Sequence, residues 1–188
     1  MDNTFYLLRH AEIKIDKKLP ISKWKLSMKG RKQAAALARK NIFEDIDLIL
    51  SSREEKAYQT AKPLASKLRK RIMKLKAFDE LHRDKGGFLE KKEFERALKF
   101  CLTHLDKSVY QWEIAKHGLK CFENGIKRID RKYRGKNILL VSHGIVINLY
   151  FAKLLNKLNR VYERTAKTTF CDYGMVKNKR VIQDIVKK

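Results

Sequence analysis

Two histidines stand directly after short apolar runs of the kind that form buried strands. His10 follows Arg9 at the end of FYLLRH, and His143 follows Ser142 at the end of LLVSH. In a parallel sheet the carboxyl ends of the strands meet at one edge, where ligands bind. The sequence therefore predicts that Arg9, His10 and His143 lie together at this edge, where an arginine and two histidines suit an anionic group such as phosphate.

A third apolar run ends in hydroxyls and cations. Residues 49–50 (IL) are followed by SSREEK, residues 51–56, at the expected start of a helix. Free N–H groups and the positive end of the dipole make a helix N-terminus suited to phosphate. One histidine after a strand is more often structural than catalytic, but two of them favour a functional site.

The elements that must position these residues alternate along the chain. Apolar runs predict strands at residues 4–8, 46–50, 71–78 and 137–141, and a closing hairpin at 168–176 and 181–186. Helical patterns predict helices at 28–40 (capped by Ser27), 54–69, 94–105, 109–133 and 144–155. This order predicts an α/β fold, a three-layer α/β/α sandwich with a mostly parallel central sheet.

Composition sets the broad class of protein. The 188 residues suffice for one domain, 1–188, and with 44% hydrophobic and 35% charged residues the chain is typical of globular proteins. Its apolar runs are far shorter than the roughly 20 residues of a membrane span, and its start, MDNTFYLL, lacks the basic segment of a signal peptide. Three cysteines without a C-x-x-C pattern indicate no disulfide framework and no zinc site, and favour a cytoplasmic location.

The formal net charge of +24 has two interpretations. A basic stretch at residues 14–40 could serve a polyanionic partner such as a nucleic acid, but Trp24 is the one aromatic residue there to stack on bases. The simpler interpretation is a lysine-rich surface, since lysines are spread along the whole chain. In either case the positive field favours small anionic substrates.

Four motifs, in order along the chain, carry a family resemblance. FYLLRHAE (5–12), LSMKGRKQAAALA (26–38), ILSSREEKAYQTA (49–61) and LLVSHGIVI (139–147) resemble the signature segments of the histidine phosphatase superfamily, the phosphoglycerate mutase-like fold. The resemblance implies that His10 is a nucleophile that carries a phosphohistidine, and that Arg9 and His143 hold the phosphoryl oxygens. Ser142 is a further phosphate-binding candidate. The resemblance implies neither a metal nor a cofactor.

Two positions depart from the family pattern. Lys56 stands where the family has an arginine, so the charge is kept but the two-pronged guanidinium is lost. Arg53, three residues earlier, is the alternative cation. Ala11 replaces a frequent glycine, and its small side chain makes that change minor.

The proton donor follows the third strand in the family. FDELHRD (78–84) resembles that segment, which selects Glu80 as the acid and places Arg83 at the trailing arginine. A shifted alignment would make Asp84 the acid, and Asp79 and Glu90 are the other acids of this loop.

Further candidates have weaker arguments. His82 is adjacent to the proposed acid segment, and Asp16 falls where the family has a phosphate-side asparagine, a position at which an acid would repel phosphate. His104 and His117 are expected to be structural, and Gln59 and Thr60 to pack their helix against the floor of the site.

These observations predict a metal-independent phosphomonoester hydrolase that acts on a small anionic phosphometabolite or on a phosphoprotein. Mutase activity ranks below hydrolysis, because mutases of the family have longer insertions, whereas only residues 79–134 are available here as a helical lid. The alternative from another class is a non-catalytic phosphate- or nucleic-acid-binding protein on the same fold.

Overall fold

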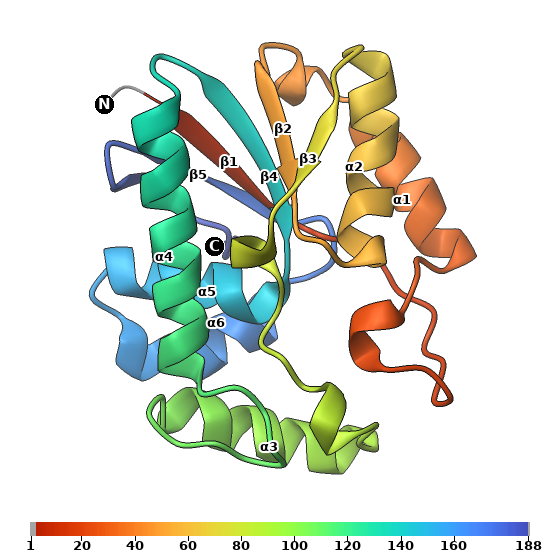
Figure 1. Cartoon of the computed structure of the whole chain (residues 1–188), viewed down its shortest axis with the longest axis vertical. Coiled ribbons are helices and arrows are strands. Elements are labelled where there is room, and N and C mark those ends of the chain that lie inside the picture. The colour runs from red at the N-terminus through yellow and green to blue at the C-terminus, as the bar shows by residue number, and fades with distance from the viewer. Residues whose placement is uncertain (1–2, 188) are drawn as a thin grey trace.

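The computed structural model describes residues 3–187, and within them a six-stranded sheet forms the centre (Figure 1). The strand order is β3-β2-β4-β1-β5-β6, in which the first four strands are parallel and β5 and β6 antiparallel. The strands are β1 (Thr4–Arg9), β2 (Leu48–Ser51), β3 (Ile72–Lys74), β4 (Asn137–Ser142), β5 (Tyr173–Lys177) and β6 (Arg180–Gln183). The predicted mostly parallel sheet and its closing hairpin are confirmed.

Helices cover both faces of the sheet. They are α1 (Met28–Ala38), α2 (Glu55–Lys67), α3 (Lys91–Thr103), α4 (Ala115–Lys132), α5 (Gly144–Leu154) and α6 (Val161–Lys167). Short 3-10 turns are η1 (Ile21–Lys23), η2 (Asn41–Phe43), η3 (Lys76–Phe78), η4 (Asp84–Gly86) and η5 (Leu158–Arg160). Among residues 3–187, no helix has the length and apolar character that crossing a membrane requires.

The alternation of side chains along β4 explains the three layers. Ile138 and Leu140 belong to the core shared with α4 and α5, whereas Leu139 and Val141 belong to the core shared with α1 and α2. Successive residues of a strand point to opposite faces, so a strand that is apolar at every position is buried on both. The predicted three-layer α/β/α sandwich is therefore confirmed.

Helix α1 is anchored to the segment that follows the first strand. Ser27 caps it as predicted, accepting a hydrogen bond of 2.9 Å from the backbone N–H of Gly30, and the Ser27 hydroxyl donates to the Glu12 carboxylate at 2.9 Å. A Cβ on Gly30 would lie 1.9 Å from the Glu12 carbonyl oxygen, so only glycine permits this approach. The helix thereby fixes the chain just beyond His10.

Three helix predictions need correction. α4 begins at Ala115 rather than at 109, because Tyr110 and Gln111 have φ of 47° and 56°, which no α-helix continues through. α3 begins three residues earlier than predicted, at Lys91. α6 was not predicted, because its sequence VYERTAK is short and largely polar, and it is positioned by tertiary contacts such as the Arg164–Asp184 ion pair.

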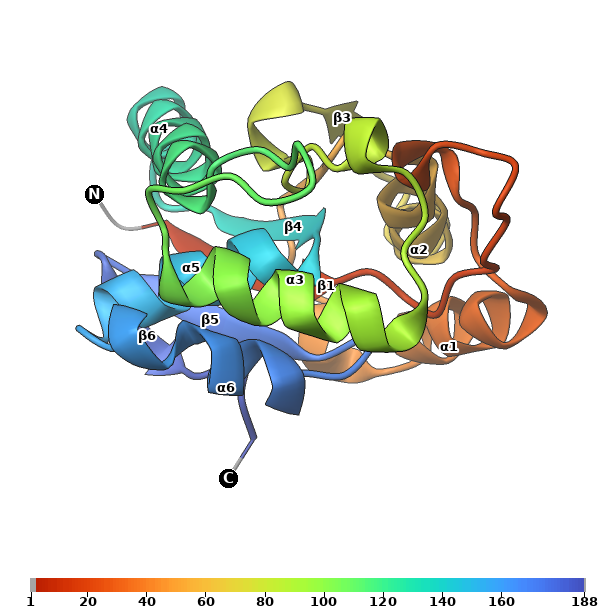
Figure 2. The same ribbon diagram turned by 90° about the horizontal axis from the view of Figure 1, so that it is seen from below.

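The segment 79–134 has two parts. α4 packs on the sheet face and contributes Phe122 and Ile126 to the core. α3 instead crosses the carboxyl-end edge of the sheet, as the view from below shows (Figure 2). Only the part around α3 therefore faces the edge at which the predicted site residues lie.

Candidate active site

A cavity of about 590 Å³ opens at the carboxyl ends of β1, β2 and β4, and we call it the His10 cavity. Of the site residues predicted from sequence, those lining it are Arg9, His10, Lys56, Glu80, Arg83, Glu90 and His143. They come from three strand ends and the loop after β3, so the parallel topology brings together residues up to 134 positions apart in the sequence.

His10 lies at the end of β1 and is only 6% exposed. Its Nδ1 is 2.8 Å from the Ala11 carbonyl oxygen, which can only accept, so Nδ1 carries the proton and Nε2 has a free lone pair when the ring is neutral. Burial holds the pKa of His10 well below its ordinary value of 6.5. Positive charge on His143, Lys56 and Arg9 lowers the pKa further. His10 is therefore an uncharged imidazole at neutral pH.

Arg9 lies against the turn into α5. Its Nη1 donates to the Thr168 carbonyl, and its guanidinium carbon is 4.7 Å from the centre of the Phe170 ring. Its Nε is buried and has no hydrogen-bond partner among the described residues, so it is a donor that a ligand oxygen could satisfy. A Cβ on Gly144 would come within 3.0 Å of that Nε, which explains the glycine after His143.

His143 ends β4 and is fully buried. Its Nε2 is 2.7 Å from the Ser52 hydroxyl and 3.5 Å from Glu54 Oε1. The ring centre is 5.2 Å from that of His10, at an interplanar angle of 61°. Burial holds the pKa of His143 well below 6.5, and the charges of Lys56, Arg83 and Arg9 add to the effect.

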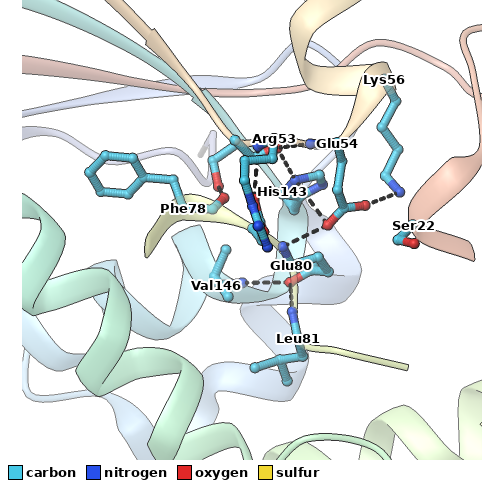
Figure 3. A network of polar contacts seen from close by, with 12 residues as sticks. Ser22, Arg53, Glu54, Lys56, Phe78, Glu80, Leu81, His143 and Val146 are labelled. Atoms are coloured by element: carbon cyan, nitrogen blue, oxygen red, sulfur yellow. Dashed lines mark hydrogen bonds and ion pairs between the residues drawn. The ribbon is translucent and has the colours of Figure 1, made fainter. Parts of the chain in front are cut away.

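Glu54 forms the centre of a polar network that the sequence did not predict (Figure 3). One carboxylate oxygen accepts from the backbone N–H of Glu80 at 2.9 Å, and the other accepts from Lys56 Nζ. Lys56 is only 2% exposed and also donates to the Ile21 carbonyl at 2.9 Å. The cation that replaces the family arginine is thus neutralised by a carboxylate. The two adjacent acids of SSREEK were the available signal, but only the fold separates the inward Glu54 from the partly exposed Glu55.

Glu80 is held against the N-terminus of α5. Its carboxylate accepts from the backbone N–H groups of Ile145 at 3.1 Å, Val146 at 3.2 Å and Leu81 at 3.1 Å. Burial nevertheless raises the pKa of Glu80 above its ordinary value of 4.5, and the neighbouring Glu54 adds to this, against the opposing effect of Arg83. A carboxyl group in this environment can stay protonated to higher pH than an exposed one.

The other acids of the loop have partners of their own. Asp79 accepts from the backbone and side chain of Arg53 at 2.7 and 2.9 Å, and Asp84 accepts from the Ser22 backbone N–H at 2.9 Å. Glu90 lines the His10 cavity at its exposed side, where it pairs with Lys17. Of these acids, the placement favours Glu80 at the inner end of the cavity.

The structure separates the remaining sequence candidates from the His10 cavity. Arg53 and the exposed His82 line a second cavity of about 740 Å³, which shares Ile21, Glu80 and Arg83 with the His10 cavity. Ser142 is fully buried, and its hydroxyl donates to the Phe78 carbonyl at 2.7 Å. Asp16 accepts from the backbone N–H of Lys18 at 3.0 Å. Their positions give no support to a direct phosphate contact.

Supporting residues hold the floor of the site in place. Thr60 accepts from the backbone N–H of Ala11 at 2.9 Å, and Gln59 accepts from that of Leu26 at 3.0 Å, in keeping with the packing role predicted for this pair. His104 follows the last residue of α3 and His117 lies on α4; both are exposed, and neither lines the cavity. In the part of the chain that the structure describes, no three His, Cys, Asp or Glu side chains form a group that could hold a metal ion.

Solved structures share this fold over nearly their whole length. The phosphoserine phosphatase mutant from Entamoeba histolytica in complex with phosphoserine has a TM-score of 0.76 at 19% identity, covering 96% of this chain and 94% of that one. The putative α-ribazole-5′-P phosphatase from Escherichia coli has a TM-score of 0.76 at 18% identity, covering 100% and 97%. The mycobacterial glucosyl-3-phosphoglycerate phosphatase has a TM-score of 0.75 at 17% identity, covering 93% and 90%. At such identities the likeness establishes the fold.

Sequence comparison places the chain in a family. No curated protein sequence matches it. The sequence profile of one family, however, matches residues 5–176, a range that runs from β1 into β5 and contains the three strand ends of the His10 cavity. The chain belongs to the histidine phosphatase superfamily (branch 1).

Proposed function

We propose that the protein is a phosphomonoester hydrolase that acts on small phosphorylated molecules through a phosphohistidine on His10. The observation that carries the proposal is the state of that imidazole. Its Nδ1 proton is held by the Ala11 carbonyl, and burial with nearby positive charge keeps the ring neutral. A neutral ring with a free Nε2 lone pair is the form that attacks phosphorus.

The reaction proceeds in two steps. His10 Nε2 attacks the phosphorus, the bond from phosphorus to the leaving oxygen breaks with its electron pair on that oxygen, and Glu80 gives its proton to it. Water then attacks the phosphohistidine, the P–N bond breaks with its electron pair returning to Nε2, and the Glu80 carboxylate takes the proton from the water. Arg9, Lys56 and His143 hold the phosphoryl oxygens through both steps.

The comparisons support the same class of reaction. Each of the three structural neighbours is titled as a phosphatase, and each covers at least nine-tenths of this chain. The segment around α3 is proposed as the lid, a smaller region than 79–134, because Phe94 and Leu98 of α3 line the His10 cavity. The three free cysteines support the proposal of a reducing, cytoplasmic location.

The structure argues against nucleic-acid binding, because the one aromatic residue of the basic stretch is buried. Trp24, the aromatic residue of the basic stretch, is 7% exposed, and its indole N–H donates to the Asp16 carbonyl at 2.8 Å. Its ring lines the His10 cavity and does not stand out from the surface, where it could stack on the bases of a nucleic acid.

The test is hydrolysis of p-nitrophenyl phosphate in EDTA, with wild type, His10→Ala and a matched His117→Ala control on exposed α4. We expect turnover and an acid-labile phosphoenzyme in the wild type and the control, and neither in His10→Ala. Wild-type turnover in His10→Ala would overturn the mechanism, and phosphate binding without turnover in all three would favour the binding-only alternative.

A further inference from the structure

The His10 cavity is much larger than a phosphoryl group needs. Its volume of about 590 Å³ is in the range of sites that enclose a whole organic ligand, roughly 300–1,000 Å³. The cationic residues Arg9 and Lys56 occupy one end, beside His10. The remaining walls must therefore contact whatever group the phosphate is esterified to.

Those walls are mainly apolar. Besides Phe170, the apolar side chains that face the cavity from the loop before α1 and from the α3 region are Ile13, Ile15, Trp24, Phe88, Phe94 and Leu98. Of the 45 lysines and arginines, Arg83 and Lys91 line this part of the cavity, so its walls are mainly apolar, although the sequence suggested a preference for highly anionic substrates. An apolar ligand that covers these walls removes them from water, which makes binding more favourable.

The apolar wall begins at the reacting groups themselves. The Phe170 ring centre is 5.7 Å from that of His10, and the Arg9 guanidinium carbon is 4.7 Å from the same ring centre. An aromatic face therefore adjoins both the nucleophile and the phosphate-binding cation. A leaving group next to the phosphate can therefore contact this ring.

Two separate segments form the outer walls and meet across the cavity. The rings of Trp24 and Phe88 lie 6.2 Å apart at their centres, with an interplanar angle of 50°. The Trp24 N–H donates to the Asp16 and Leu19 carbonyls within its own loop. The ring therefore needs no hydrogen bond from a ligand. Ile15 remains 56% exposed at the cavity, which is a high fraction for a large aliphatic side chain.

Most charged groups on these walls are engaged or lie at the rim, but Arg83 keeps a buried Nε without a hydrogen-bond partner among the described residues. Arg83 has its guanidinium carbon 5.5 Å from the Phe94 ring centre and 5.1 Å from that of Trp112. Glu90 is paired with Lys17 in an exposed ion pair. Lys91 is exposed at the start of α3.

We infer that the site takes phosphomonoesters whose alcohol part is apolar or aromatic, in preference to sugar phosphates and phosphoamino acids. That the bound molecules are hydrolysed rests on the proposed function. The preference for an apolar group rests on the cavity walls alone. The phosphoryl group lies among Arg9, Lys56 and His143, and the apolar part lies between Phe170, Trp24 and Phe88.

The test is the binding of a series of n-alkylphosphonates from methyl to hexyl, measured by calorimetry and by competition against p-nitrophenyl phosphate. Their C–P bond cannot be hydrolysed by this chemistry, so calorimetry measures binding whether or not the protein turns over esters. Transfer of a methylene from water to an apolar wall predicts affinity that rises about two- to fourfold per CH₂. A phosphonate of equal length that ends in a carboxylate is expected to bind more weakly than the hexyl compound.

Variants locate the effect in the cavity. Ile15→Ser is expected to reduce the rise in affinity per methylene, and Phe88→Ala to reduce it further. The matched control is Ile182→Ser on β6, which is 60% exposed, does not line the cavity and should keep the wild-type rise. Ile15→Ser changes an exposed side chain, so loss of folding is not expected to obscure the result.

The outcomes separate the two proposals. A rise with chain length in a protein that hydrolyses no ester keeps the binding inference and overturns the hydrolase proposal. Hydrolysis of p-nitrophenyl phosphate with affinity flat from methyl to hexyl, or with tighter binding of the carboxylate-ended compound, overturns the inference and keeps the hydrolase. An equal rise in wild type and Ile15→Ser and Phe88→Ala would also overturn it, because the apolar contact would then lie elsewhere.

Discussion

Two neutral histidines buried in one site should make the fold sensitive to acid. His10 and His143 are 6% and 0% exposed, and both have pKa values well below the ordinary 6.5, chiefly because of burial and then because of neighbouring positive charge. In the unfolded chain each imidazole gains a proton near pH 6.5, whereas in the folded protein it stays neutral. Stability is therefore complete above pH 6.5 and falls as the pH drops below it, until the folded pKa is reached.

The size of the effect follows from proton linkage. For a group that is protonated only in the unfolded state, going from about pH 7.5 to about pH 5.5 lowers the free energy of unfolding by about 1.4 kcal/mol. Two such groups give about 2.7 kcal/mol, a substantial part of a typical total of about 5–15 kcal/mol. The Glu80 carboxyl acts in the opposite direction, because its raised pKa favours the protonated folded state as the pH falls towards 4.5.

The assay is urea unfolding at both pH values for wild type, His10→Gln and His143→Gln, with His117→Gln as the exposed control. The quantity compared is the change between the two pH values within each variant, so a general loss of stability cancels. Each site variant should lose about 1.4 kcal/mol less on acidification than the wild type, roughly 0.5 M or more in the urea midpoint, and the control should match the wild type. Equal acid sensitivity in all four proteins would refute the reasoning, since each imidazole would then have the same pKa in the folded and the unfolded state.

The other predictions concern catalysis. The rate should fall with acid as His10 gains a proton, at a pH below 6.5, and fall again on the alkaline side as Glu80 loses its proton, so the optimum is displaced towards acid; a flat profile across this range would contradict both assignments. Glu80→Gln should slow alkyl phosphate hydrolysis far more than that of p-nitrophenyl phosphate, whose leaving group hardly needs a proton; equal losses would place the acid elsewhere. Lys56→Arg should retain or raise activity if Lys56 binds phosphate, and a large loss in kcat/KM would show that the enclosed site is adapted to lysine. Glu54→Gln leaves the buried Lys56 without its countercharge, so it should lower the melting temperature, and inorganic phosphate should raise it more than in wild type; an equal shift would mean that Glu54 does not compete for the lysine.

Sequence reasoning located the strand ends because the signal there is local. FYLLRH and LLVSH each place a polar group directly after an apolar run, and the parallel sheet then brings His10 and His143 together whatever the intervening loops do. The same reasoning did not decide firmly between Lys56 and Arg53 as the phosphate-binding cation. The orientation of the helix decides which of the two cations points inward. The structure places Lys56 in the His10 cavity and pairs Arg53 with Asp79.

Residues defined by packing between distant segments could not be predicted. Phe170 lies in a polar stretch after α6, and nothing in its sequence neighbourhood indicates that its ring adjoins His10. Glu54 acquires its role only because the backbone N–H of Glu80 and the Lys56 amine both reach it. The contacts of Phe170 with His10 and of Glu54 with Glu80 depend on tertiary structure, since each joins residues that are far apart along the chain.

The Glu54–Lys56 pair and the apolar walls together suggest how binding energy is distributed in this site. Because a carboxylate neutralises Lys56, the hold on phosphate beside His10 rests mainly on Arg9, whose buried Nε has no partner among the described residues. Arg83, the other cation of the cavity with such a buried Nε, lies against the rings of Phe94 and Trp112. A weak hold on phosphate alone would limit inhibition by the inorganic phosphate that hydrolysis releases. The Phe170 ring and the walls beyond it can then supply binding to the ester that free phosphate cannot obtain, and remote binding of this kind can serve to position the phosphorus against His10.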